Sequence, residues 1–212
     1  MSKKFWIALI LVVVGFMGFI WLDGGKDATG SDAASGAGTQ VTHITGKQDA
    51  AVKLVEYSDF QCPACGAYYP IVEQIVEKYK DRISFEYRHY PLTTIHRNAF
   101  AAARASEAAG KQGKFWEMYR LLFANQSAWS ESDNSRTIFE GYARQLNLGM
   151  GQYRTDFASN ETNGAINASI REFNELGLPQ STPTFLLNGK KIQPRDAADF
   201  SRLIDEQMSV TR

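Results

Sequence analysis

The chain has few cysteines and histidines and no excess of charge of either sign. Its 212 residues include two cysteines and three histidines, and 23 basic residues balance 23 acidic ones. No basic stripe is available to neutralise phosphates, so nucleic acid is not an expected partner. The two cysteines, Cys62 and Cys65, are separated by two residues, and a bridge between them would close almost no loop. Such a bridge adds little stability, so the pair indicates reactivity or metal binding instead.

A metal site is the less favoured interpretation of the cysteine pair. Structural sites normally need four ligands, from two such pairs or from cysteines together with histidines. The histidines are His43, His89 and His96, and none of them forms a ligand-spaced pair with another. The sequence therefore predicts no metal site. A Cys-x-x-Cys pair beside a strand–helix–strand pattern favours thiol–disulfide chemistry, and an inert bridge is the remaining alternative.

One long hydrophobic run stands near the beginning, at residues 5–22, and contains no charged side chain. A helix of this length would be roughly 27 Å long, close to the hydrocarbon thickness of a bilayer. Lys3 and Lys4 precede the run and Asp23 follows it, which predicts a cytoplasmic amino terminus and an extracytoplasmic remainder. We expect a single-pass anchor in the cell membrane. A cleaved signal peptide is the alternative, and it would export the rest of the chain as well.

Composition divides the chain into three parts. Residues 1–22 are the expected cytoplasmic stub and transmembrane anchor, and residues 23–40, rich in Gly, Ala, Ser and Asp, are an expected flexible linker. Residues 41–212 have the length and pattern of one folded α/β domain.

Strand and helix periodicities within residues 41–212 predict the order of elements. Strands are expected at 52–57, 83–89, 184–187 and 190–193, and helices at 63–79, 95–109, 114–124, 135–146, 150–158, 161–176 and 196–208. The order gives a parallel βαβ half, a helical insertion at about 95–176, and a ββα half closed by an Asn-Gly hairpin.

Cys62 stands between the first strand and a helix expected to begin at Pro63, because proline is favoured at the first helical position. A thiolate there faces unpaired backbone N–H groups and the positive end of the helix dipole, which lower its pKa. Cys65 lies one turn further on the same side, where it can attack a mixed disulfide formed at Cys62. The two cysteines are therefore the predicted catalytic pair, and their redox-active disulfide is the only expected redox group.

Glu56 is the predicted proton carrier of this site. In its strand it shares a face with Val52 and Leu54, so its side chain is expected to point toward the core. A buried carboxyl has a raised pKa and can exchange a proton near neutral pH. We expect Glu56 to deprotonate Cys65 during resolution of the mixed disulfide. The alternative is an acid at the strand end that reaches solvent.

With these residues in place, the sequence resembles the DsbA-like branch of the thioredoxin superfamily over about residues 48–208. The branch comprises extracytoplasmic thiol–disulfide oxidoreductases, and the resemblance implies a thioredoxin-like fold with a helical insertion. Its motifs occur in the family's order: VEYSDFQCPAC at 55–65 with Glu56, Pro70 in the following helix, RHYPL at 88–92, QGKFWEMYRLLF at 112–123, and STPTFLLNGK at 181–190.

The resemblance also implies roles for residues that periodicity does not single out. It implies a cis bond between Thr182 and Pro183, with Pro183 against the cysteine pair and the backbone of Thr182 pairing with extended substrate. Pro63 follows the family's pattern beside the cysteines. Ala64 departs from it, because oxidants of the family often carry His or Tyr there. The departure leaves the reduction potential open, but not the thiol chemistry.

Together these features predict an enzyme that introduces disulfide bonds into newly exported, unfolded proteins. The resemblance implies reoxidation by an integral-membrane, quinone-linked thiol oxidase. A disulfide reductase or isomerase using the same residues is the first alternative, and a peptide-binding or chaperone module with incidental thiols is the second.

Overall fold

The computed structural model describes residues 41–211. The predicted anchor at residues 5–22 and linker at residues 23–40 lie outside the described residues and stay predictions. Among residues 41–211, every helix is too short or too polar to cross a membrane.

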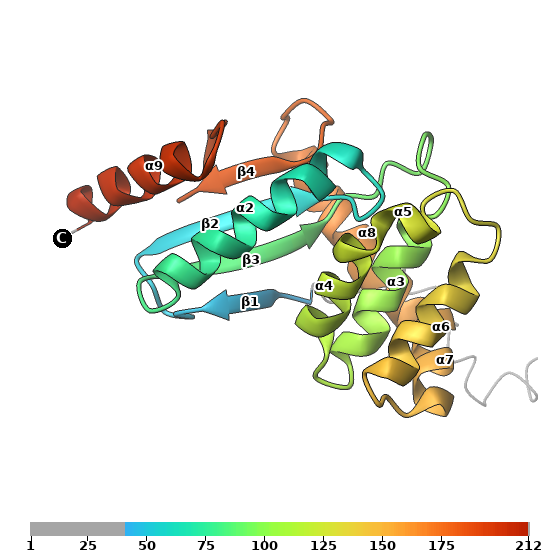
Figure 1. Cartoon of the computed structure of the whole chain (residues 1–212). Coiled ribbons are helices and arrows are strands. Elements are labelled where there is room, and N and C mark those ends of the chain that lie inside the picture. Colours follow the sequence, from blue (N-terminus) through green and yellow to red (C-terminus); the bar gives the residue numbers. More distant parts are fainter. Residues whose placement is uncertain (1–40, 212) are drawn as a thin grey trace, which may run out of the picture. The chain divides into compact units, whose positions relative to one another are not determined.

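The described part is built on a five-stranded mixed sheet (Figure 1). Its strands are β1 (His43–Gly46), β2 (Val52–Ser58), β3 (Ile83–His89), β4 (Thr184–Leu187) and β5 (Lys190–Ile192), in the order β1-β3-β2-β4-β5. Strands β2 and β3 are parallel, and every other pairing is antiparallel. The predicted βαβ unit is therefore confirmed, and β2, which leads into the cysteine pair, lies at the centre of the sheet.

Helices account for most of the remainder. They are α2 (Pro63–Tyr79), α3 (Ala99–Gly110), α4 (Phe115–Ala124), α5 (Gln126–Trp129), α6 (Ser135–Gln145), α7 (Met150–Ala158), α8 (Asn160–Glu175) and α9 (Ala197–Val210). Helices α3 to α8 form the predicted helical insertion between the two halves of the sheet. The α/β plan expected from the sequence is confirmed for the described residues.

The sequence prediction was wrong in three places. It missed β1, because four residues are too few to show a period. It missed the single-turn helix α5 for the same reason. It began the first insertion helix at about 95, whereas α3 begins at Ala99. Residues 92–98 instead form a loop whose polar groups bind the loop before Cys62.

The hairpin at Asn188 and Gly189 joins β4 to β5 as predicted. Both residues have positive φ, 47° and 79°, as the tight turn requires. The Asn188 side chain also accepts a hydrogen bond of 2.7 Å from the N–H of Lys53 and donates one of 3.0 Å to the carbonyl of Ala51. The turn is thereby fixed to the start of β2.

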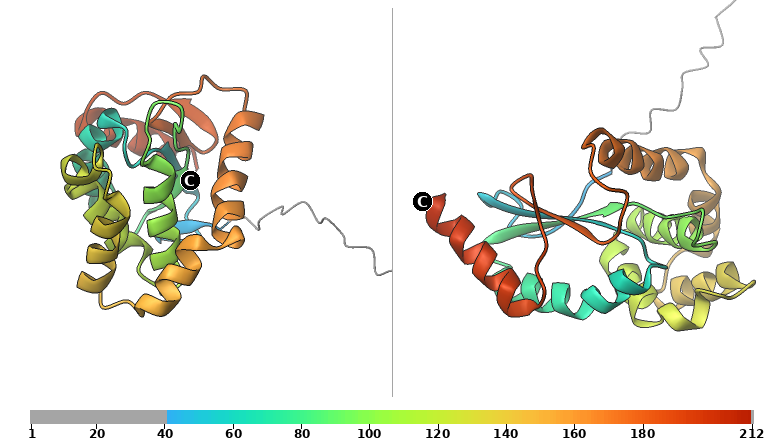
Figure 2. Two further views of the ribbon diagram at one scale, coloured as in Figure 1. Left: turned by 90° about the vertical axis from the view of Figure 1, so that its right-hand side faces the viewer. Right: turned by 90° about the horizontal axis from the view of Figure 1, so that it is seen from above.

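Alternation along β2 decides which side chains face the site. Val52 and Leu54 pack in one cluster with side chains of α2 and α9, while Tyr57 packs against Phe173 of α8, with ring centroids 4.9 Å apart. Figure 2 shows α2 and α8 on opposite sides of the sheet. Because side chains alternate along a strand, Glu56 shares the face of Leu54 and lies under α2.

The insertion contributes an aromatic core that reaches the cysteine pair. Phe115, Tyr119, Phe123 and Trp129 are all buried. The same cluster contains Phe60, Cys62 and Cys65. The cysteine pair therefore lies where the insertion meets the sheet.

Candidate active site

Cys62 occupies the N-cap position of α2, directly before Pro63. Its backbone N–H donates to the carbonyl of Asp59 at 3.1 Å, and its carbonyl accepts the first helical hydrogen bond, from Gly66 at 3.0 Å. The side chain makes no capping hydrogen bond, and the sulfur lies at the positive end of the helix. Pro63 and Ala64 are exposed beside it and form the outer surface of the site.

The environment of Cys62 favours its thiolate. A hydrogen bond from the thiol of Cys65 is the largest effect and, with contributions from Thr182 and the backbone N–H groups of Cys65 and Ala64, lowers the pKa of Cys62 to about 5. Burial opposes the shift but does not cancel it. Cys62 is thus a thiolate at neutral pH.

Cys65 has the opposite character. It is completely buried, and burial is the first cause that raises its pKa well above the ordinary thiol value. The neighbouring thiolate of Cys62 and the charge of Glu56 raise it further. Both cysteines are reduced in the structure, with no disulfide between them. The pair therefore combines one exchangeable thiolate with one thiol that holds its proton.

Glu56 is buried, with 1% of its surface exposed, so the expected orientation toward the core is confirmed. Burial raises the pKa of its carboxyl to about 7, and the nearby Ser58 hydroxyl opposes part of the shift. The charge of Glu56 raises the pKa of Cys65, and both side chains are buried. A carboxyl of this kind can give or take a proton near neutral pH.

Thr182 and Pro183 approach the pair from the far end of the chain. The bond between them is cis, as the resemblance implied. The Sγ atom of Cys62 lies 3.5 Å from the carbonyl oxygen of Thr182. A cavity of about 440 Å³ opens beside Pro183, and its lining includes Tyr68, Phe185, Lys191, Ile192 and Arg195.

Asp59 organises the loop before Cys62, and the sequence did not single it out. It is 1% exposed, and its carboxylate accepts hydrogen bonds from the N–H of Gln61 at 2.7 Å and of Leu92 at 2.9 Å. The Nδ1 atom of His96 lies 2.6 Å from the same oxygen that Leu92 binds. Asp59 thereby joins the cysteine loop to the loop that precedes α3.

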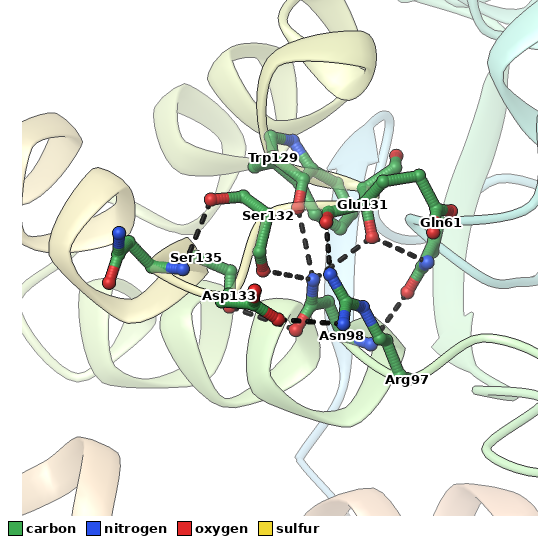
Figure 3. A network of polar contacts seen from close by, with 10 residues as sticks. Gln61, Arg97, Asn98, Trp129, Glu131, Ser132, Asp133 and Ser135 are labelled. Carbon is green, nitrogen blue, oxygen red and sulfur yellow. Dashed lines mark hydrogen bonds and ion pairs between the residues drawn. The ribbon is translucent and has the colours of Figure 1, made fainter.

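Gln61 extends this support into the insertion (Figure 3). Its side chain donates to the carbonyl of Ser130 at 2.8 Å and accepts from the N–H of Asn98 at 2.7 Å. The amide of Asn98 in turn donates to the carbonyls of Trp129, Ser130 and Ser132. This polar network joins the residue before Cys62 to the start of α3 and the end of α5.

Gln126, the first residue of α5, binds the cysteine loop directly. Its side-chain amide donates to the carbonyls of Phe60 at 2.7 Å and Cys62 at 2.9 Å. Phe60 and Cys62 lie 66 and 64 residues before Gln126 in the sequence, so no local pattern could have predicted these contacts. The backbone that carries the thiolate is therefore held from the insertion side.

The structure brings together two histidines that no sequence spacing connects. Nε2 atoms of His43 and His89 lie 2.7 and 2.8 Å from the same oxygen of Glu107. Burial raises the pKa of Glu107, but the two histidines outweigh it and lower the pKa to about 2. These three residues could supply metal ligands. In the structure their ligand atoms already bind one another by hydrogen bonds.

Comparison with known proteins agrees with this geometry. A family model described as "Thioredoxin" matches residues 38–206. Among solved structures, a thioredoxin-like oxidoreductase from Silicibacter pomeroyi is 22% identical with a TM-score of 0.68, covering 84% of this chain and 99% of that one. Wolbachia pipientis α-DsbA1 is 21% identical (TM-score 0.70, 80% and 92% covered), and oxidised Bacillus subtilis BdbD 20% identical (TM-score 0.69, 78% and 92% covered).

Curated relatives share more sequence over a smaller part of their length. A Na(+)/H(+) antiporter NhaA 3 of Salinispora tropica is 38% identical over 149 residues, covering 70% of this chain and 22% of the antiporter. A Na(+)/H(+) antiporter NhaA 1 of Mycobacterium sp. (strain KMS) is 37% identical over 171 residues, 77% of this chain and 26% of the antiporter. The chain thus spans about a quarter of the length of these relatives.

Proposed function

We propose that this chain, which belongs to the thioredoxin family and has the fold of the DsbA-like thiol–disulfide oxidoreductases, exchanges disulfides with other proteins through Cys62 and Cys65. The observation that carries the proposal is the contrast between the two sulfurs. Cys62 is a thiolate at the start of α2, and Cys65 is a buried thiol that keeps its proton. A stable thiolate of this kind is a good leaving group, which favours passing the disulfide to a substrate.

The proposed direction is oxidation of the substrate. A substrate thiolate attacks Cys62 of the Cys62–Cys65 disulfide, a mixed disulfide forms, and Cys65 leaves and takes a proton. A second substrate thiolate then attacks the substrate sulfur of the mixed disulfide and releases Cys62. The substrate dithiol loses two electrons and two protons. The enzyme gains both electrons, Cys65 holds one proton, and the other goes to solvent.

Glu56 is the proposed donor of the proton that Cys65 takes. Its pKa of about 7 lets it act as an acid when the disulfide opens and as a base when it forms again. Burial of both groups supports the role, since a thiolate leaving into an apolar site is costly unless it is protonated.

Substrate is proposed to lie along Thr182, whose carbonyl is 3.5 Å from the reactive sulfur. An extended segment pairing with this backbone would be bound mainly through main-chain groups and so without strict sequence requirements. This mode suits unfolded exported proteins, which are the proposed substrates. Pro63 and Ala64, exposed beside Cys62, would form the opposite wall of this contact.

The proposed location is the outer side of the cell membrane, with the amino terminus in the cytoplasm. The uncharged run at residues 5–22, with Lys3 and Lys4 before it, supports this location. Reoxidation by an integral-membrane, quinone-linked partner belongs to the same proposal. Ion transport is a property named for the antiporter relatives, and the match covers about a quarter of them.

The test addresses both the direction of disulfide exchange and the role of Cys62. Full-length protein, purified in detergent, is expected to oxidise a reduced model protein, and Cys62→Ser is expected to abolish the reaction. A glutathione titration of the pair distinguishes the alternatives: an oxidising potential agrees with the proposal, whereas one as low as that of thioredoxin, ~−270 mV, would indicate a reductase. Activity that survives Cys62→Ser would refute the exchange itself.

A further inference from the structure

Several buried polar atoms around Cys65 have no hydrogen-bond partner among the described residues. They are Oε2 of Glu56 and the hydroxyls of Ser58, Tyr87 and Tyr119. Each of these residues is at most 1% exposed. Burying a hydroxyl without a hydrogen bond is unfavourable, and such groups are usually satisfied by internal water with two to four polar partners. Their grouping beside a proton-carrying carboxyl therefore needs an explanation.

In space, Tyr87 lies next to Glu56, and Tyr119 follows it toward the surface. Tyr87 is directly opposite Glu56 in the parallel ladder of β2 and β3. Its ring is 5.2 Å from that of Tyr119 on α4, centroid to centroid. Tyr119 is also 5.7 Å from Tyr69 on α2, which is only partly buried. The three rings thus pack one against the next, from Tyr87, the strand neighbour of Glu56, to the partly buried Tyr69.

The tyrosines also interact electrostatically with Glu56 and Cys65. Burial is the first cause that raises the pKa of both Tyr87 and Tyr119, and the charge of Glu56 is the second in each case. Cys65 raises both as well, and Tyr69 acts on Tyr119. Both hydroxyls therefore stay protonated at neutral pH, as a group that passes protons on must.

We propose that Tyr87 and Tyr119 form a proton path that joins Glu56 to solvent through Tyr69. The inference rests on the proposed function, because it explains how the buried carboxyl of Glu56 is reprotonated after giving its proton to Cys65. Each hydroxyl takes a proton from one side and gives its own to the other, through internal water, so no net charge remains on the tyrosines. They act through Glu56 and are positioning residues.

The groups that face Glu56 come from three packed elements. Helix α2 supplies Cys65, β3 supplies Tyr87 and α4 supplies Tyr119. Strand β4 places the apolar Phe185 opposite Glu56. Burial is the main cause of the raised pKa of Glu56, and the Ser58 hydroxyl opposes part of the shift.

The pKa of Glu56 determines the pH range in which the proton path is needed. Below pH 6 the carboxyl already holds the proton that Cys65 needs, and a single reduction of the disulfide requires no supply from outside. Above pH 8 the carboxyl is mostly ionised, and the proton must arrive along the path. Loss of the path should therefore slow the reaction at high pH only.

The experiment is single-turnover reduction of the oxidised full-length protein by glutathione, from pH 5 to 9, corrected for the thiolate fraction of glutathione. Tyr119→Phe keeps the ring and removes the hydroxyl. We expect it to slow reduction by about tenfold above pH 8 and to leave the rate below pH 6 unchanged. Tyr153→Phe is the matched control, because Tyr153 is also buried with an unpartnered hydroxyl but lies on α7.

A second measurement does not depend on turnover. In reduced protein, carbon-13 NMR titration of the Glu56 carboxyl is expected to show a midpoint raised by roughly one pH unit in Tyr119→Phe, since the proposed water-mediated link to the carboxylate is lost. An unchanged midpoint together with an unchanged pH profile, or a rate that falls equally at every pH, would overturn the proton path. A wild-type disulfide that does not react with glutathione at all would instead refute the proposed function, and the titration would still decide the path.

Discussion

The sulfur of Cys62 lies 3.5 Å from the carbonyl oxygen of Thr182, although 120 residues separate the two in the chain. The contact brings the start of α2 against the loop that leads from the helical insertion into β4. It leaves the thiolate between a helix terminus, which stabilises its charge, and a backbone edge that an extended peptide can join. The nucleophile and the backbone proposed to bind substrate thus lie side by side.

The thiolate of Cys62 gives the first prediction. Its pKa of about 5 means that alkylation of the reduced protein by iodoacetamide should be nearly constant from pH 9 down to pH 6 and should fall through pH 5. Cys65 should stay unmodified in the native protein at pH 7, because it is buried and its pKa is raised. Peptide mass spectrometry distinguishes the two sites.

Cys65→Ala is the control for this assignment. The interaction with Cys65 is the largest cause of the lowered pKa, so its removal should move the alkylation midpoint of Cys62 upward. A wild-type midpoint near 8.5, the ordinary thiol value, would contradict the structure.

Burial of Glu56 gives a pH dependence of stability. The folded state raises its pKa from 4.5 to about 7, so the folded protein binds the proton more tightly than the unfolded chain. The free energy of unfolding should therefore decrease as pH rises from 4.5 through 7, by up to about 3 kcal/mol. Glu56→Gln should remove this decrease and be more stable than wild type at pH 8.

Urea unfolding at pH 5 and pH 8 measures the effect in both proteins. Glu117→Gln is a suitable comparison, because burial raises the pKa of Glu117 but Lys114, a backbone hydrogen bond and Arg120 together outweigh burial and lower it overall. Equal pH dependence in wild type and Glu56→Gln would show that the carboxyl is solvated in solution.

Gln126 is predicted to support the cysteine loop. Gln126→Ala leaves the carbonyls of Phe60 and Cys62 without their donor, at a cost of about 1–3 kcal/mol in the free energy of unfolding. We also expect slower exchange at Cys62, since the backbone beneath the sulfur loses a fixed contact. Gln112→Ala is the control, because the Gln112 side chain binds Gly149 at the far end of the insertion. A change of equal size in both variants would argue against a special role for Gln126.

The three-residue cluster of His43, His89 and Glu107 is predicted to be complete without a metal ion, because its ligand atoms already bind one another. Neither a chelator nor added Zn²⁺ should change the melting temperature. Glu107→Ala should destabilise the protein by about 3–5 kcal/mol, since it removes a buried charged acceptor from two histidines. A melting temperature that rises with Zn²⁺ in wild type but not in Glu107→Ala would show that the cluster binds metal.

Sequence and structure agree where a local pattern carries the information. The βαβ unit follows from strand periodicity and from Pro63 at the start of α2, and the hairpin follows from Asn188 and Gly189. The orientation of Glu56 follows from alternation along one strand. These features depend on neighbours only a few residues away.

The supporting residues of the site were not predictable in the same way. Asp59, Gln61 and Gln126 act through contacts to residues far along the chain, and nothing in their immediate sequence marks them. The start of α3 was misplaced because residues such as Asn98 bind the cysteine loop and do not continue the helix. Polar contacts between distant segments decide these details, and the periodicity of the sequence does not predict such contacts.

Because Gln126 binds the carbonyls of Phe60 and Cys62 and Asn98 binds the side chain of Gln61, the insertion is not a detachable module added to a finished thioredoxin core. A miniature enzyme made by excising α3 to α8 would keep both sulfurs but would expose the carbonyls beneath them to water. Engineering that aims to shrink or transplant this catalyst must therefore carry α3 and α5 along with the cysteine loop.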